Sequence, residues 1–165
     1  MKKRICAFAA TVLLGATITT GFAFLSPEET EILKGVDGVR VEIKRLKPEI
    51  ERDGLFRSTL QTDAELKLQM AGIKVLSEDD AADRPNIPSL YLNLDALKCS
   101  LGYVYRIQFT LREMVTLTRK PVKTLGTTYR TTERFGISTN LSEIREDARE
   151  VVDDFIKAWM EANSK

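Results

Sequence analysis

Acidic side chains gather most densely at Glu78, Asp79, Asp80 and Asp83, where they could offer oxygen ligands to a calcium ion. An EF-hand loop needs carboxylates at alternating positions and a later bidentate Glu, and this segment has neither. The acids favour instead the first turn of a helix, whose dipole they stabilise, with Ser77 as its cap. A second acidic set is predicted on the solvent face of the last helix: Asp147, Glu150, Asp153 and Asp154.

Four tyrosines in segments with strand character could line a ligand groove or stack on glycan rings: Tyr91, Tyr103, Tyr105 and Tyr129. Strand aromatics usually pack against their cross-strand neighbours, so core packing is the favoured interpretation.

The sequence contains no histidine, which removes the commonest general base and the commonest metal ligand. Serine–histidine and cysteine–histidine catalysis are excluded, and so is an ordinary zinc site. We therefore expect no catalytic, cofactor-binding or metal-binding residues and no enzymatic activity. A hydrolase that uses only carboxylates stays open, because Asp and Glu from distant segments can meet in a fold.

Cys99 is the one cysteine outside the first 23 residues, so no intramolecular disulfide can form once that segment is removed. Its strand context favours burial as a small apolar side chain. The alternative is an exposed thiol that pairs between chains.

The candidate interaction face lies in the longest predicted strand, 103–119. Its side chains share one face of that strand: Arg106, Gln108, Thr110 and Arg112, with Thr116 and Thr118 beyond and Thr128 and Arg130 on the next strand. The opposite face is apolar, as expected for a strand with one side in the core. The polar face is either solvated or a docking surface for a protein partner, which Arg suits better than mobile Lys.

These residues must be positioned by a sheet and two helices. Alternation predicts strands over 38–46, 73–77, 90–99, 103–119 and 122–134, with a bulge or an edge near Glu113. Helical periodicity predicts a helix over 55–72 that ends at a left-handed Gly72 and buries the face of Phe56, Leu60, Ala64, Leu68 and Ala71. The last helix begins after Asn140, its predicted N-cap, with Glu143 as capping-box partner.

The element order is therefore β-α-β-β-β-β-α. Two helices with one apolar face each and a mostly antiparallel sheet predict an α+β two-layer sandwich. We expect four to five strands with both helices on one face of the sheet. The other face is expected to be polar and open to solvent.

The first 23 residues have the layout of a secretory signal peptide. Residues 2–4 are basic and precede an uncharged run that ends in small residues, with the predicted cut after Ala23. The alternative is a retained membrane helix, which the threonines and glycines of the run disfavour. We therefore expect a periplasmic or secreted protein without a stable membrane anchor. A linker or short helical turn is expected over 24–37, and a single α+β domain over 38–165.

The stretch "TDAELKLQMAGIKVLSEDDA" resembles a pattern of bacterial envelope proteins, in which a helix ends in a small residue and Gly before a short strand and an acidic turn. With "SLYLNLDALK" and the long hairpin after it, the chain is similar to uncharacterised secreted bacterial envelope proteins. The element order is also similar to the amino-terminal domain of the Tol-system translocation protein and to the auxiliary lipoproteins of envelope lipid transporters. This chain lacks the lipidated cysteine of those lipoproteins.

Removal of the first 23 residues takes away three of the 25 basic residues and none of the 24 acidic ones, which leaves a net charge of about −2. Nucleic acid is therefore not an expected partner, because its binders normally carry a basic excess. The resulting prediction is an exported non-enzymatic envelope protein that binds a protein partner or forms a homo-oligomer. The alternative is a periplasmic carrier of a small molecule or lipid, held between the helices and the sheet.

Overall fold

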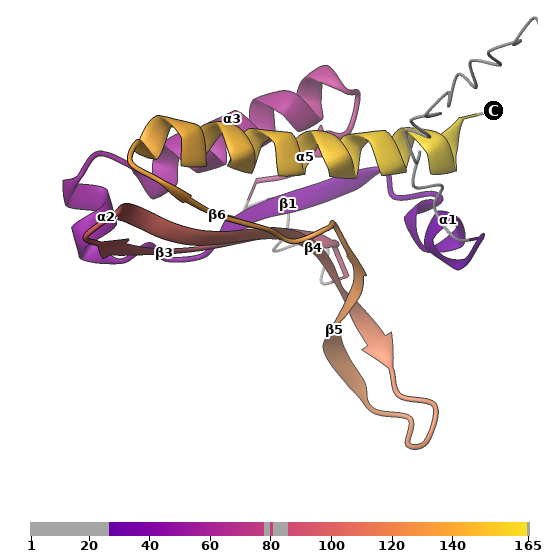
Figure 1. The fold of residues 1–165 in the computed structure, drawn as a ribbon. Coiled ribbons are helices and arrows are strands. Elements are labelled where there is room, and N and C mark those ends of the chain that lie inside the picture. The colour runs from indigo at the N-terminus through magenta and orange to yellow at the C-terminus, as the bar shows by residue number, and fades with distance from the viewer. Residues whose placement is uncertain (1–26, 78–79, 81–85, 165) are drawn as a thin grey trace, which may run out of the picture.

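The computed structural model describes residues 27–77, 80 and 86–164 (Figure 1). Four helices lie in these residues: α1 (Pro27–Leu33), α2 (Pro48–Arg52), α3 (Arg57–Met70) and α5 (Leu141–Asn163). Six strands accompany them: β1 (Gly38–Ile43), β2 (Lys74–Val75), β3 (Ser89–Cys99), β4 (Gly102–Thr116), β5 (Lys123–Arg130) and β6 (Arg134–Ser138). The predicted signal peptide and Glu78, Asp79 and Asp83 fall outside the described residues.

The strands form one mixed sheet in the order β2-β1-β3-β4-β5, and β6 also pairs with β4. The α+β sandwich is confirmed, with six strands in place of four to five. β1 runs parallel to both β2 and β3, while the remaining pairs are antiparallel. The parallel pairs exist because α2 and α3 carry the chain from the end of β1 back to the starts of β2 and β3.

α3 and α5 lie side by side on one face of this sheet and bury their apolar stripes against it (Figure 1). Phe155 of α5 is fully buried and meets Phe109 of β4 edge-on, with ring centroids 5.7 Å apart. Tyr129 of β5 packs on the same ring at 6.0 Å. Trp159 adds a polar anchor, because its indole N–H donates to the carbonyl of Val36 at 2.7 Å.

The helix ends follow the sequence signals with one change. Gly72 adopts φ +84° after α3, as predicted for a residue that closes a helix in the left-handed conformation. Asn140 caps α5 by accepting from the amide of Ser142 at 2.9 Å. Glu143 does not bond directly to the Asn140 amide as a capping box requires. The Ser138 hydroxyl lies between them: it accepts from the Asn140 amide at 2.9 Å and donates to Glu143 at 2.5 Å.

One local prediction differs from the structure, and two short helices add to the predicted elements. Phe56 is half exposed at the N-cap of α3, because the helix begins one residue later and turns that side chain away from the core. Pro48 begins α2, where its fixed φ suits the first turn of a helix. The segment expected to be a linker or helical turn contains α1, and Leu33 at the end of α1 is fully buried.

The predicted strand over 122–134 ends as β5 at Arg130, and a second strand, β6, follows from Arg134 on the same side of β4. They are divided at Thr131, whose amide donates to the carbonyl of Phe109 at 2.9 Å while its hydroxyl accepts from the Phe109 amide at 3.1 Å. At the break, the Thr131 hydroxyl thus takes the place of a backbone carbonyl as the acceptor for the Phe109 amide. The predicted bulge lies close by: the register skips Thr128, whose hydroxyl donates to Glu113 at 2.5 Å.

The ends of β4 and β5 leave the sheet as a projecting hairpin (Figure 1). β3 pairs with β4 only as far as Arg112, and beyond that point β5 is the one partner of β4 among the described strands. A two-stranded ribbon with no covering layer is marginally stable alone, so this hairpin depends on the sheet at its base.

Candidate interaction surface

The predicted interaction face lies on the side of β4 that α3 and α5 leave uncovered. The predicted face consists of Arg106, Gln108, Thr110 and Arg112. The apolar residues that alternate with these four are buried under α5, so the four side chains point to the open side. Thr110 is itself buried, and its hydroxyl lies 3.4 Å from the carbonyl oxygen of Tyr91. The alternation in the sequence located this face, and its role in binding stays a prediction.

Arg106 belongs to a row of ion pairs that crosses the open face. Its guanidinium lies 3.5 Å from Asp95 on β3 and 3.3 Å from Glu133, just before β6. Asp95 also accepts from the ammonium group of Lys44, just after β1, at 2.8 Å. The hydrogen bond from Lys44 lowers the pKa of Asp95, against an opposing contribution from burial. Each charge in this row therefore has an internal partner.

The other long polar side chains of the face are also engaged. The guanidinium of Arg112 stacks over the Tyr91 ring, 3.6 Å from its centroid. Gln108 donates to the carbonyl of Thr131 at 3.4 Å. A partner that docked on these groups would have to compete with contacts already made inside the sheet.

An apolar patch continues the open face beyond these charges. It consists of Leu97, Val104, Phe135 and Ile137, which are 52%, 43%, 73% and 58% exposed. Val104 lies directly opposite Leu97 on β3 and Ile137 on β6, so the patch crosses three adjacent strands. Phe135 lies opposite Arg106, which joins the patch to the ion-pair row.

This patch was not predicted from the sequence, although a signal was present. In each strand these apolar residues occupy the positions that alternate with the core residues, and β6 was not recognised as a separate strand. A groove of about 470 Å³ lies at the boundary with the ion-pair row, lined by Leu97, Val104 and Phe135 and bordered by Lys47. Cys99 follows Leu97 on the same face and is exposed, so the prediction of burial is wrong: neither α3 nor α5 covers this side of β3.

β6 has one paired edge and one edge that no described strand occupies. The bonds between Phe109 and Thr131 determine which backbone groups of β6 point toward β4. They show that the amide and carbonyl of Phe109 point toward the side of β4 on which β6 lies. Backbone groups alternate along a strand, so Arg134, Gly136 and Ser138 direct theirs to β4. The amides and carbonyls of Phe135 and Ile137 therefore point away from the sheet, at its free edge.

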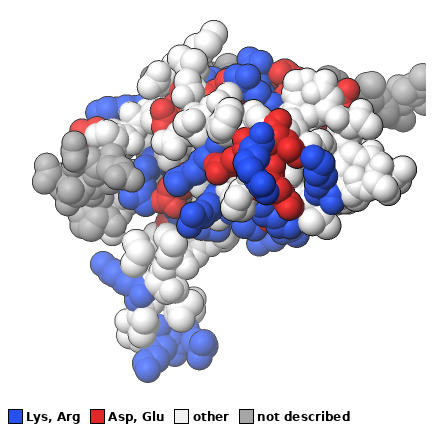
Figure 2. Space-filling model, turned by 90° about the vertical axis from the view of Figure 1, so that its left-hand side faces the viewer, with Lys and Arg blue, Asp and Glu red and all other residues white. Residues whose placement is uncertain are grey.

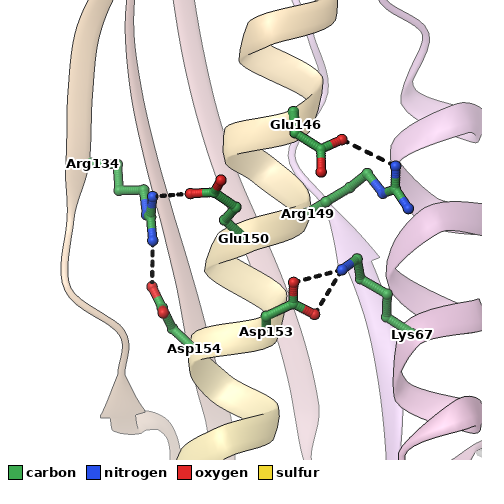
Figure 3. Close-up of polar contacts among 7 residues, drawn as sticks. All are labelled: Lys67, Arg134, Glu146, Arg149, Glu150, Asp153 and Asp154. Atoms are coloured by element: carbon green, nitrogen blue, oxygen red, sulfur yellow. Dashed lines mark hydrogen bonds and ion pairs between the residues drawn. The ribbon is translucent and has the colours of Figure 1, made fainter.

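Three acids of α5, Glu150, Asp153 and Asp154, are about half exposed, as expected for a solvent face, and they are also held in ion pairs (Figure 3). Arg134 of β6 pairs with Glu150 and, at 3.0 Å, with Asp154. On the other side of the helix, Asp153 pairs with Lys67 of α3 at 2.6 Å. Basic residues from both neighbouring elements thus pair with acids of the helix. Asp147 accepts a hydrogen bond from the hydroxyl of Tyr105.

The four tyrosines do not converge on one groove. Tyr91 lies on the open face and Tyr129 in the core, while Tyr103 donates to Asp53 at 2.8 Å. Tyr105 packs over Gly136, and its hydrogen bond to Asp147 raises the pKa of its hydroxyl to about 12. These positions agree with packing and cross-strand contacts.

Charge is distributed unevenly between the body and the projecting hairpin (Figure 2). Basic and acidic side chains alternate over the body, whereas only basic ones gather at the end of the hairpin. The basic residues there are Arg119, Lys120 and Lys123, and the stretch 114–127 contains no acid.

The space between α3, α5 and β3 offers little room for a carried molecule. Its lining includes Leu60, Ala64, Leu92 and Val152, and it has no volume that would admit a water molecule. A separate groove of about 610 Å³ lies beside the turn after α1 and is lined in part by Lys34, Asp37, Lys74 and Glu113. None of the helices in the described residues is long and apolar enough to span a membrane.

No protein-family model matches the chain, and no curated protein is similar to it. Among solved structures, the chain is similar to a dodecamer of a PelC variant from Paraburkholderia phytofirmans. The identity is 14%, the TM-score is 0.40, and the match covers 72% of this chain and 87% of that chain.

Proposed function

We propose that the chain is an exported, non-enzymatic protein of the bacterial envelope that binds a protein partner, either a different protein or a second copy of itself, through the apolar patch. One observation carries this proposal: four exposed apolar side chains lie together on three adjacent strands, on a face that neither long helix covers. Single exposed apolar residues are ordinary, but a contiguous group on a sheet face is typical of a binding surface.

The surroundings of the patch suit a protein partner. Protein interfaces have an apolar centre and a polar, solvated rim. Here the row of Lys44, Asp95, Arg106 and Glu133 borders the patch on one side. Full burial of a Phe or Ile side chain is worth about 1.5–3 kcal/mol, so Phe135 and Ile137 would be the main anchors.

Export is supported by the signal-peptide layout of the first 23 residues. Mass analysis of the protein recovered from the envelope tests it. The mature chain is expected to begin at Phe24 or within a few residues of it. Recovery of an exported chain that still begins at Met1 would refute the predicted cleavage.

Site-specific photocrosslinking in cells that produce the full chain tests the binding function. A photoreactive amino acid at position 135 is expected to form a covalent adduct with a protein. The matched control is position 70 at the end of α3, where Met70 is 87% exposed but lies outside the patch. Equal adducts from both positions, or none from position 135, would argue against a binding surface at the patch.

A further inference from the structure

We propose that the partner at this surface is a second copy of the chain, which pairs its β6 with β6 of the first copy in antiparallel orientation. The two-fold axis passes beside Gly136, and the two sheets become one. This inference rests on the proposed function, because it names the protein that the apolar patch binds.

The free edge of β6 carries the hydrogen-bonding groups that such a pair needs. The amide and carbonyl of Phe135 point outward, and so do those of Ile137, as the backbone phase requires. In the two-fold arrangement Phe135 exchanges both bonds with Ile137 of the partner copy, and Ile137 exchanges both with Phe135 of the partner copy. Four backbone hydrogen bonds form without disturbing any bond between β6 and β4.

The sequence of β6 is self-complementary about its central glycine. In Arg134–Ser138, an apolar residue stands on each side of Gly136, and both side chains lie on the open face. The proposed register places Phe135 opposite Ile137 twice, so the two apolar patches merge into one. A register centred on Phe135 would place Ile137 opposite Glu133, an acid that already pairs with Arg106.

Gly136 permits the close approach that this register demands. Residues that face each other without hydrogen bonds lie only about 4.5 Å apart between Cα atoms. A side chain at this position would also collide with β4, because an added Cβ would lie 2.8 Å from the hydroxyl oxygen of Tyr105. On the helix side, Arg134 would face Ser138 of the partner copy, so no like charges lie directly opposite.

β6 also lacks the features that keep edge strands apart. In natural proteins, Lys, Pro, bulges or inward-pointing charges prevent edge strands from pairing with other chains. The middle of β6 is Phe-Gly-Ile, and its one charged residue, Arg134, is held by Glu150 and Asp154 of α5 (Figure 3). An unprotected apolar edge that continues a sheet is therefore best explained by pairing with an identical edge.

Disulfide trapping between two differently labelled chains tests the register. One mature chain carries Phe135→Cys and the other Ile137→Cys, both with Cys99→Ser. In the proposed pair these positions are about 5.5 Å apart between Cα atoms, within the span of a disulfide. Two copies of position 135, or of position 137, are ~9 Å apart and outside that span. The mixture is expected to give more crosslinked dimer than either chain alone, and equal same-site crosslinking would overturn the register.

Native mass spectrometry of the mature chain tests the self-pairing itself. A dimer is expected, and Ile137→Lys should raise its dissociation constant at least about tenfold. Leu125→Lys is the matched control, because Leu125 is 59% exposed but lies on the projecting hairpin. A monomer at high concentration, with a crosslink from position 135 to a different protein, would overturn this inference and leave the proposed function standing. No adduct from position 135 would remove both.

Discussion

Phe155 and Phe135 provide a matched pair of perturbations, because one phenylalanine is fully buried and the other is 73% exposed. Phe155→Ala removes a ring that contacts Phe109 at 5.7 Å and Tyr129 at 6.0 Å between centroids. The loss of a buried ring costs about 3–5 kcal/mol of unfolding free energy. That loss is a large share of the roughly 5–15 kcal/mol unfolding free energy typical of a domain. It corresponds to a decrease of about 2 M in the urea concentration at the unfolding midpoint. Phe135→Ala should change the unfolding free energy by no more than about 0.5 kcal/mol.

Urea unfolding followed by tryptophan fluorescence measures both variants. Trp159 is the single tryptophan, and its indole bonds to Val36 in the folded chain, so it reports the docking of α5. The measurements belong at the lowest usable protein concentration, where association adds little apparent stability. Similar midpoint shifts in the two variants would refute the assignment of Phe155 to the core and Phe135 to the surface.

Three further perturbations follow from named contacts. The hydrogen bonds from Arg145 lower the pKa of Asp63, so the contribution of Asp63 to stability is present above its unfolded pKa near 3.8 and is lost as the pH falls through its lower folded pKa. Asp63→Asn should therefore flatten the fall in stability below about pH 4, measured by an acid titration followed by circular dichroism. Gly136→Ala should lower the thermal midpoint through its collision with Tyr105, and Tyr105→Phe should recover part of the loss in a double-mutant cycle; full additivity would refute the collision. Arg106→Glu should destabilise the chain by about 1 kcal/mol in urea, because it places a third acid in the ion-pair row; an unchanged midpoint would show that the row contributes nothing.

The local signals in the sequence located most elements well. α5 follows its apolar stripe and begins at its predicted cap, Asn140, and α3 ends at Gly72 as its left-handed glycine indicates. The alternation of β4 separated the buried from the open side chains. These features depend on neighbours within a few residues, which is why the sequence alone reveals them.

Features set by distant contacts were not predictable in the same way. The parallel pairing of β1 with β3 depends on the path of α2 and α3, and the break between β5 and β6 depends on a side-chain bond from Thr131 to β4. The apolar patch was missed because alternation shows that a residue faces away from the core but not whether a helix covers it. Its exposure follows from the placement of both long helices on the opposite face (Figure 1).

Amide hydrogen exchange at Phe135 and Ile137 tests most directly whether β6 is paired on both edges in the working protein. Both amides point away from β4, so a single copy leaves them open to solvent and they should exchange fast. We expect both amides to become protected as the concentration of the mature chain rises, and Ile137→Lys to abolish the protection at position 135. Fast exchange of both amides at every concentration, with the amides of Arg134 and Gly136 protected, would contradict it.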